Sequence, residues 1–123
     1  MSTAEQRARG RANYKRWYAK RERKEYFYQK RLHTKVETLA QYGPHGELKC
    51  SWPSCSVDDV DMLSLDHIEN NGAEERKRTG ILGGYNLYVR LKAKDFPPGF
   101  QTLCCNHQMK KAILLLREKK GRA

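Results

Sequence analysis

Two pairs of soft metal ligands stand at spacings that are typical of structural zinc sites. Four residues separate Cys50 from Cys55, and two separate Cys104 from His107. Thiolates and imidazoles in two such pairs bind Zn²⁺ with tetrahedral geometry. The 48 residues between the pairs exceed the length of an ordinary zinc finger, which implies an inserted functional unit. We therefore predict a structural zinc site, which would also reinforce the small core of so short a chain.

The remaining cysteine, Cys105, leaves the ligand set open at one position. It could take the place of Cys104, or be buried as a small apolar residue. In a reducing compartment all four cysteines are expected to be thiols or metal ligands rather than disulfides.

A second constellation is the dipeptide Asp66-His67 on an expected strand over 62–68. Neighbouring residues of a strand point to opposite sides, so the pair can divide two roles. A carboxylate suits Mg²⁺ or Mn²⁺, and an imidazole suits a general base that takes a proton from water. Most Asp-His pairs are ordinary surface residues. This pair lies between the two halves of the predicted zinc site, which favours a catalytic interpretation.

The last predicted helix, 106–120, begins with Asn106, His107 and Gln108. A helix N-terminus is a favourable place for phosphate, and a side chain here could face Asp66 across a bound divalent ion. The alternative is that Asn106 caps the helix and that its neighbours are surface residues.

The elements that would position these residues are short. Their apolar patterns predict strands over 62–68 and 100–103 and helices over 85–94 and 106–120. Asn70-Asn71-Gly72 predicts a turn, and Pro97-Pro98-Gly99 predicts a break. The expected fold class is therefore α+β.

A long basic helix is expected before these elements, because 12–40 contains no Gly or Pro and Gly43-Pro44 would end it. Residues 1–40 hold 12 Lys/Arg against 4 Asp/Glu. We predict a helical DNA-binding extension over 1–42 and a zinc-stapled domain over 43–123. A solvated charged helix is the alternative, but it needs no surplus of one sign. The expected contact residues are Arg16, Trp17, Lys20, Arg23 and Lys24.

The composition points to an anionic partner, because the net charge is +11 and the pI about 9.7. The longest apolar run, 112–116, is far below the roughly 20 residues that span a bilayer. No apolar signal-peptide segment stands near residue 1. We therefore expect an intracellular, cytoplasmic protein that binds nucleic acid and not a membrane.

Together these residues resemble the HNH endonuclease family, above all its small phage and intron-associated members. The similarity lies in Cys-x4-Cys at 50–55, LDHIENNG at 65–72, PPGFQTLCCNHQMKKA at 97–112 and the basic, aromatic-rich N-terminal segment. It covers most of the chain. The resemblance implies a ββα unit around one divalent ion, buttressed by zinc, with His67 as general base and Asp66 as a ligand of a catalytic Mg²⁺ or Mn²⁺. A phage-encoded protein acting in a bacterial host fits it.

The chain departs from the family pattern at its end, where members commonly have C-x-x-C followed by His or Asn. In the register that we favour, His107 takes the second Cys position and Gln108 takes that of the catalytic-ion ligand. Glutamine keeps an amide oxygen but is one methylene longer than asparagine. In a rival register, His107 serves the catalytic ion and Cys105 joins the zinc ligands.

The resemblance implies hydrolysis of phosphodiester bonds in double-stranded DNA, by nicking or by double-strand cleavage. The alternative is a catalytically weak or inactive DNA-binding protein supported by zinc. The intact Asp66-His67 pair favours the enzyme, because a pure binding protein does not need it. A homodimer through the aromatic residues of the long helix is compatible with the sequence. Further phosphate contacts, or else a solvated face, are expected at Arg76, Arg78, Lys110 and Lys111.

Overall fold

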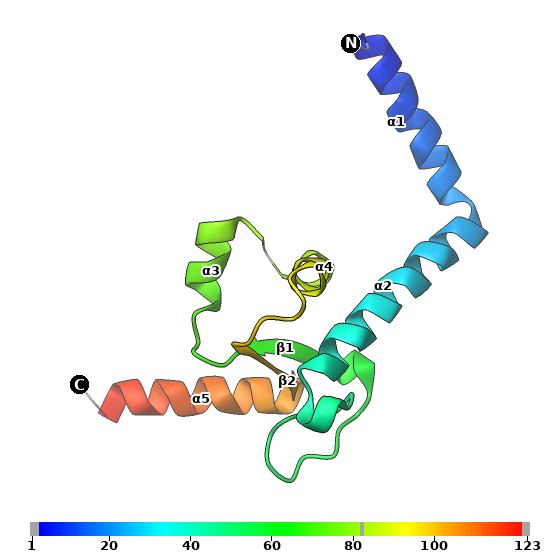
Figure 1. The fold of residues 1–123 in the computed structure, drawn as a ribbon. Helices are drawn as coiled ribbons and strands as arrows, with labels where there is room; N and C mark the ends of the chain where they lie inside the picture. Colours follow the sequence, from blue (N-terminus) through cyan, green and yellow to red (C-terminus); the bar gives the residue numbers. More distant parts are fainter. Residues whose placement is uncertain (1–2, 82, 122–123) are drawn as a thin grey trace. The chain divides into compact units, whose positions relative to one another are not determined.

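A computed structural model of the chain describes residues 3–81 and 83–121, which form helices and one two-stranded sheet (Figure 1). The predicted α+β class is confirmed at this level. In chain order the elements are α1 (Ala4–Ala19), α2 (Arg21–Gln41), η1 (Pro44–Gly46), η2 (Val60–Met62), β1 (Leu63–His67), α3 (Gly72–Thr79), α4 (Tyr85–Ala93), β2 (Phe100–Cys104) and α5 (Cys105–Gly121).

The chain divides into two compact units, with the boundary between His33 and Thr34. This boundary falls inside α2, whereas the sequence suggested a division after residue 42. The reason is that the last turns of α2 carry the buried residues Thr34, Thr38 and Leu39, which belong to the second unit.

The basic N-terminal segment forms two helices, so the expectation of one helix over 12–40 is wrong at Lys20. The side chain of Thr3 and that of Gln6 form a capping box that begins α1. Lys20 has an extended backbone with ψ of 132° and ends it. Neither Gly nor Pro marks this break. It is accompanied by Arg23, whose guanidinium donates to the carbonyl of Trp17 at 3.1 Å and lies 4.5 Å from the centre of the Trp17 ring.

In the second unit the expected strands and the helices near 85–94 and 106–120 are confirmed within one or two residues. β1 and β2 are antiparallel, with Leu63 opposite Cys104 and His67 opposite Phe100. α5 follows β2 without a loop. The helix α3 was missed, because its sequence GAEERKRT has no apolar periodicity and none of its residues is buried.

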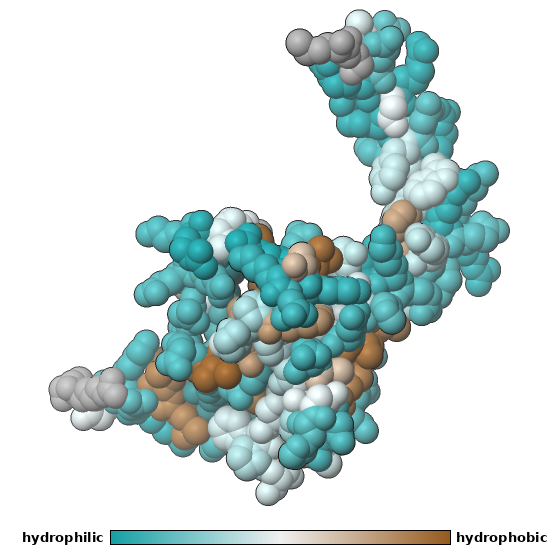
Figure 2. All heavy atoms as spheres, in the orientation of Figure 1, coloured by the Kyte–Doolittle hydropathy of each residue, from teal (hydrophilic) through white to brown (hydrophobic). Residues whose placement is uncertain are grey.

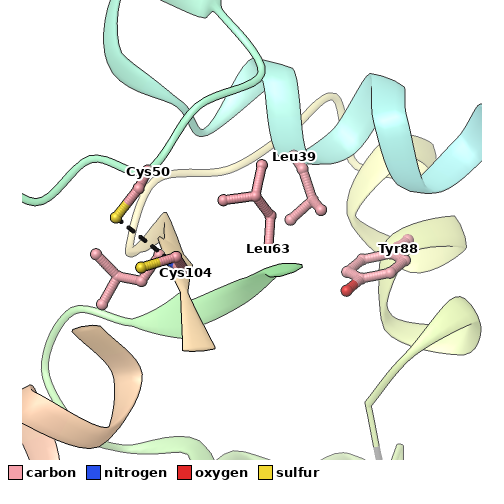
Figure 3. Packing of buried hydrophobic residues seen from close by; sticks show 6 residues of the cluster. Leu39, Cys50, Leu63, Tyr88 and Cys104 are labelled. Atoms are coloured by element: carbon pink, nitrogen blue, oxygen red, sulfur yellow. Dashed lines mark hydrogen bonds between the residues drawn. The ribbon is translucent and has the colours of Figure 1, made fainter. Parts of the chain in front are cut away.

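The core of the second unit is small and lies where α2, α4 and the sheet meet (Figure 3). Two of its buried apolar members are cysteines, namely Cys50 and Cys104. Thr102 joins the parts: its hydroxyl donates to the carbonyl of Leu39 at 2.7 Å, and its own carbonyl accepts from the amide of Ser51 at 2.7 Å. The segment that carries the first cysteine pair is therefore held along β2.

The apolar residues of α5 remain on the surface, as the hydrophobic atoms along this helix in Figure 2 indicate. Met109 and Leu116, which share a face with Ile113, are 67% and 59% exposed. Across the ranges 3–81 and 83–121, no helix combines the length and apolar character needed to cross a membrane.

Candidate metal centre and adjoining acid-base site

Four side chains from three segments converge on one point: Cys50, Cys55, Cys104 and His107. Their ligand atoms all lie within 4.8 Å of one another, and we call this group the Cys3His cluster. Cys50 and Cys55 come from the loop before β1, Cys104 ends β2, and His107 lies in the first turn of α5. Three sulfurs and one imidazole nitrogen are a donor set that suits tetrahedral zinc. The cluster could therefore hold a metal ion such as zinc.

The contacts inside the Cys3His cluster identify the donor atoms. Nδ1 of His107 lies 3.2 Å from Sγ of Cys104 and 3.6 Å from Sγ of Cys50. The sulfurs of Cys55 and Cys104 are 4.0 Å apart. The amide of Cys104 donates to Sγ of Cys50 at 3.2 Å, the bond drawn in Figure 3. A backbone donor to a sulfur stabilises the thiolate form that binds metal.

The first cysteine pair is held in a tight loop. The amide of Cys55 donates to the carbonyl of Trp52 at 3.0 Å, and Ser54 has a positive φ of 65°. The indole of Trp52 stacks on the ring of His107, with 4.8 Å between centroids and 9° between planes. This stacking orients the imidazole toward the sulfurs. The one local signal for this stacking is the position of Trp52 inside the Cys-x4-Cys loop.

The two buried thiols titrate differently. Burial raises the pKa of Cys50. Burial alone would also raise the pKa of Cys104, but hydrogen bonds from the backbone amide of His107 and from the thiols of Cys50 and Cys55 outweigh it and lower the pKa. Cys104 thus gives up its proton more readily than Cys50, and a bound cation would favour loss of the thiol protons.

Cys105 lies outside the Cys3His cluster. It is exposed, and its thiol points to the sulfur of Met62 at 4.0 Å. The structure therefore groups His107 with Cys104, as in the favoured register, and not with Asp66.

Asp66 faces α5. Its Oδ2 accepts from Nζ of Lys111 at 2.6 Å and from Nε2 of Gln101, its cross-strand neighbour, at 2.9 Å. The Lys111 ammonium also donates to the carbonyls of His67 at 2.9 Å and Ile68 at 3.2 Å. The Lys111 side chain is only 19% exposed. A cation thus already lies against the carboxylate that was predicted to hold a divalent ion.

His67 faces α3, on the other side of the strand. Its Nε2 lies 2.8 Å from Oε2 of Glu75, and its ring packs on Phe100 with 4.8 Å between centroids. Only 15% of the His67 side chain is exposed. The expectation that Asp66 and His67 point to different neighbours is met, since one bonds to α5 and the other to α3. Sequence reasoning did not find Glu75, because α3 itself was not expected.

Asp66 and His67 both line one open depression of 420 Å³, which we call the β1–α5 depression. Its wall also includes Gln108, Lys111 and Arg76. Nε2 of Gln108 donates to the hydroxyl of Ser64 at 3.0 Å. The carboxylate of Asp66 and the amide oxygen of Gln108 are ligand types that Mg²⁺ accepts. A divalent ion bound between them would compete with the Lys111 ammonium for Oδ2 of Asp66.

The other basic residues predicted to contact phosphate are distributed as follows. Arg76 lines the β1–α5 depression, Arg78 lies 3.7 Å from Glu75, and Lys110 is exposed on α5. In the first unit, Lys24 is exposed, Lys20 is the helix break, and Arg16 donates to the side chain of Asn13. There the aromatic rings form a cluster of their own, with centroid distances of 5.7 Å for Tyr14–Trp17 and 5.6 Å for Trp17–Phe27.

Comparison with known proteins adds no assignment: no family model, no curated protein and no solved structure matches the chain.

Proposed function

We propose that the protein is a metal-dependent DNA endonuclease of the HNH type, in which β1, β2 and α5 form a ββα unit. The observation that supports this most is the β1–α5 depression, which is lined by Asp66, His67 and Gln108, the last of them the residue after His107 of the Cys3His cluster. An imidazole and a carboxylate beside a metal-stapled helix are the parts that metal-assisted phosphodiester hydrolysis requires.

In this proposal His67 is the general base. It takes a proton from a water molecule, whose oxygen forms a bond to phosphorus while the bond from phosphorus to the 3′ oxygen of the DNA breaks. Arg76, on the wall of the same depression, binds the scissile phosphate and favours the build-up of negative charge there. The ring of Phe100 limits the motion of the His67 imidazole.

Asp66 and Gln108 would hold the catalytic Mg²⁺ or Mn²⁺. When bound, such an ion stabilises negative charge on the phosphate and on the leaving oxygen. Lys111 must then release Asp66, and its ammonium becomes available to DNA phosphate as the sequence predicted. The Cys3His cluster, with Zn²⁺ as the proposed occupant, fixes the start of α5 through His107. It therefore also fixes the position of Gln108, the next residue.

Double-stranded DNA is the proposed partner because of the charge distribution. The surplus of Lys and Arg lies in residues 1–40, and α1 has no buried residue. Arg16, Lys20 and Lys24 would neutralise phosphates, while Trp17 and Arg23, already packed together, would offer a flat surface. Binding should therefore weaken steeply with rising salt, in proportion to the number of phosphates neutralised.

The test is cleavage of supercoiled plasmid by purified protein in EDTA, Mg²⁺ or Mn²⁺. We expect nicked or linear product that requires the divalent ion and is lost in His67→Ala. The matched control is His33→Ala, a histidine exposed on α2. Equal cleavage by wild type and His67→Ala would refute the mechanism, and a near-ultraviolet circular dichroism spectrum equal to that of wild type shows that the second unit of the variant has kept its fold.

A DNA-binding protein without catalysis is the second candidate, and one observation favours it. The ammonium of Lys111 makes three hydrogen bonds around Asp66, and this is the position that a catalytic cation would need. This candidate predicts a salt-sensitive gel shift of the plasmid with no strand breaks under any divalent ion.

A further inference from the structure

We propose that Glu75 is a positioning residue that holds Nε2 of His67, so that Nδ1 is the nitrogen that accepts the proton from water. This inference deepens the proposed function and rests on it, because it concerns the same imidazole. Glu75 contributes to the site from α3, a helix that carries none of the residues assigned above except Arg76 and Arg78.

The contact between the two side chains is specific. Oε2 of Glu75 lies 2.8 Å from Nε2 of His67, a hydrogen-bond distance, while the other oxygen, Oε1, lies 3.7 Å from Arg78. The Glu75 side chain is 27% exposed and that of His67 15%. Both side chains are therefore largely buried, and the carboxylate can fix both the ring orientation and the position of the ring proton.

The opposite nitrogen lies beside Gly72, a residue without a side chain. A Cβ placed on Gly72 would come within 3.0 Å of Nδ1 and 3.3 Å of Cε1 of His67, and within 3.1 Å of Nη1 of Arg76. All three residues line the β1–α5 depression. The space that a side chain at residue 72 would fill therefore lies between Nδ1 and the Arg76 guanidinium, where the water and the phosphate of the proposed function would lie.

These two facts assign separate tasks to the two ring nitrogens. A neutral imidazole carries a proton on one nitrogen and a lone pair on the other, and the hydrogen bond made by the first decides which is which. With Glu75 accepting the proton of Nε2, the lone pair is on Nδ1, directed at the depression. When Nδ1 takes a proton from water, the charge that forms on the ring is stabilised by the carboxylate on the other side.

The experiment compares Glu75→Gln, which keeps an acceptor oxygen, with Glu75→Met, which keeps the length but removes it. Glu74→Met is the matched control, since Glu74 is the exposed neighbour in the same first turn of α3. We expect kcat for plasmid nicking to fall tenfold or more in Glu75→Met, with KM little changed. In Glu74→Met kcat should stay within about threefold of wild type. In Glu75→Gln kcat should lie between those of Glu74→Met and Glu75→Met, because the amide keeps an acceptor for the Nε2 proton but lacks the charge that stabilises the protonated ring.

A second readout does not depend on activity. In ¹H–¹⁵N spectra of selectively labelled protein, wild type and Glu75→Gln should show a hydrogen-bonded Nε2–H proton on His67 that is protected from exchange, and Glu75→Met should lack it. A protected proton on Nδ1 instead would overturn the assignment. Gly72→Ala should keep the Nε2–H signal and yet lose cleavage, because its methyl group crowds Nδ1.

The outcomes separate the inference from the proposed function. Wild-type protein that cleaves no DNA with any divalent ion overturns the proposed function and the catalytic part of the inference together. Active wild type with an equally active Glu75→Met or Gly72→Ala overturns the inference alone and leaves His67 as the base.

Discussion

Replacement of Cys104 by Ser would remove one donor from the Cys3His cluster at its most buried position. Cys104 is 1% exposed and pairs with Leu63 at the end of the sheet. It also contacts the other three members of the cluster, namely Cys50, Cys55 and His107. We expect the variant to bind zinc far more weakly than wild type, because an alcohol is a poor ligand for Zn²⁺ beside thiolates. The second unit should lose stability as a consequence.

The size of the effect follows from the role of the metal in small folds. Structural zinc contributes an apparent ~10–16 kcal/mol in zinc-finger peptides, so one ligand in four accounts for roughly 2.5–4 kcal/mol. The net stability of a domain is only about 5–15 kcal/mol. Seven apolar residues are buried among those described, and two of them, Cys50 and Cys104, are cluster members. The loss should therefore be a large fraction of the total.

The assay has two parts. Zinc content is measured on purified protein by elemental analysis, and thermal unfolding is followed by near-ultraviolet circular dichroism, which reports on Trp52 stacked on His107. The matched control is Cys105→Ser, one residue along the chain and exposed. Wild type and Cys105→Ser should each hold one zinc per chain and lose the Trp52 signal cooperatively when a chelator is added.

The reasoning would be refuted by a wild-type protein that purifies without zinc and melts unchanged in chelator. It would also be refuted if Cys105→Ser lost the metal and Cys104→Ser kept it, because Cys105 would then take the place of Cys104 among the ligands.

Three further changes have defined outcomes. Lys111→Met should raise the affinity for Mn²⁺ by roughly tenfold, about 1.4 kcal/mol, because no ammonium then competes for Asp66; titration followed by electron paramagnetic resonance measures it. Leu39→Ala should cost about 2–5 kcal/mol in urea unfolding, since Leu39 is 0% exposed. Tyr42→Phe should cost about 1 kcal/mol near neutral pH through loss of the 2.6 Å hydrogen bond to the carbonyl of Pro97. Burial raises the pKa of Tyr42 from 10.0 to about 12, so the wild type should lose stability as the pH rises through that window; a Phe variant with the same loss would contradict this.

The zinc ligands and the main elements of the second unit could be predicted from sequence because each has a local signal. Cysteine and histidine spacing identified the Cys3His cluster, and apolar alternation identified β1 from Leu63 to His67. These signals need no knowledge of what lies across the fold. The strand pattern also implied that Asp66 and His67 would find different partners.

What could not be predicted depends on contacts that are distant in sequence or on polar segments. α3 has no apolar face, so the sequence pattern did not predict this helix. The contact between Glu75 and His67 could therefore not be predicted either. Lys111 was expected to meet phosphate, and its bond to Asp66 spans 45 residues of chain. The break at Lys20 contains no Gly or Pro. It is accompanied by a cation–π contact between Arg23 and Trp17, which no local sequence pattern predicts.

The Cys3His cluster and the Asp66-His67 pair lie at opposite ends of one short sheet, so a structural change at one end can affect the other. Leu63 pairs with Cys104 at the first end, and His67 pairs with Phe100 at the other. α5 carries His107 in the cluster and Gln108 and Lys111 in the depression, within one helical turn of each other. Loss of the metal would free the start of α5 and so move Gln108 and Lys111 relative to Asp66. Under the proposed function, zinc removal should therefore abolish the divalent-ion-dependent cleavage, although no member of the Cys3His cluster lines the β1–α5 depression.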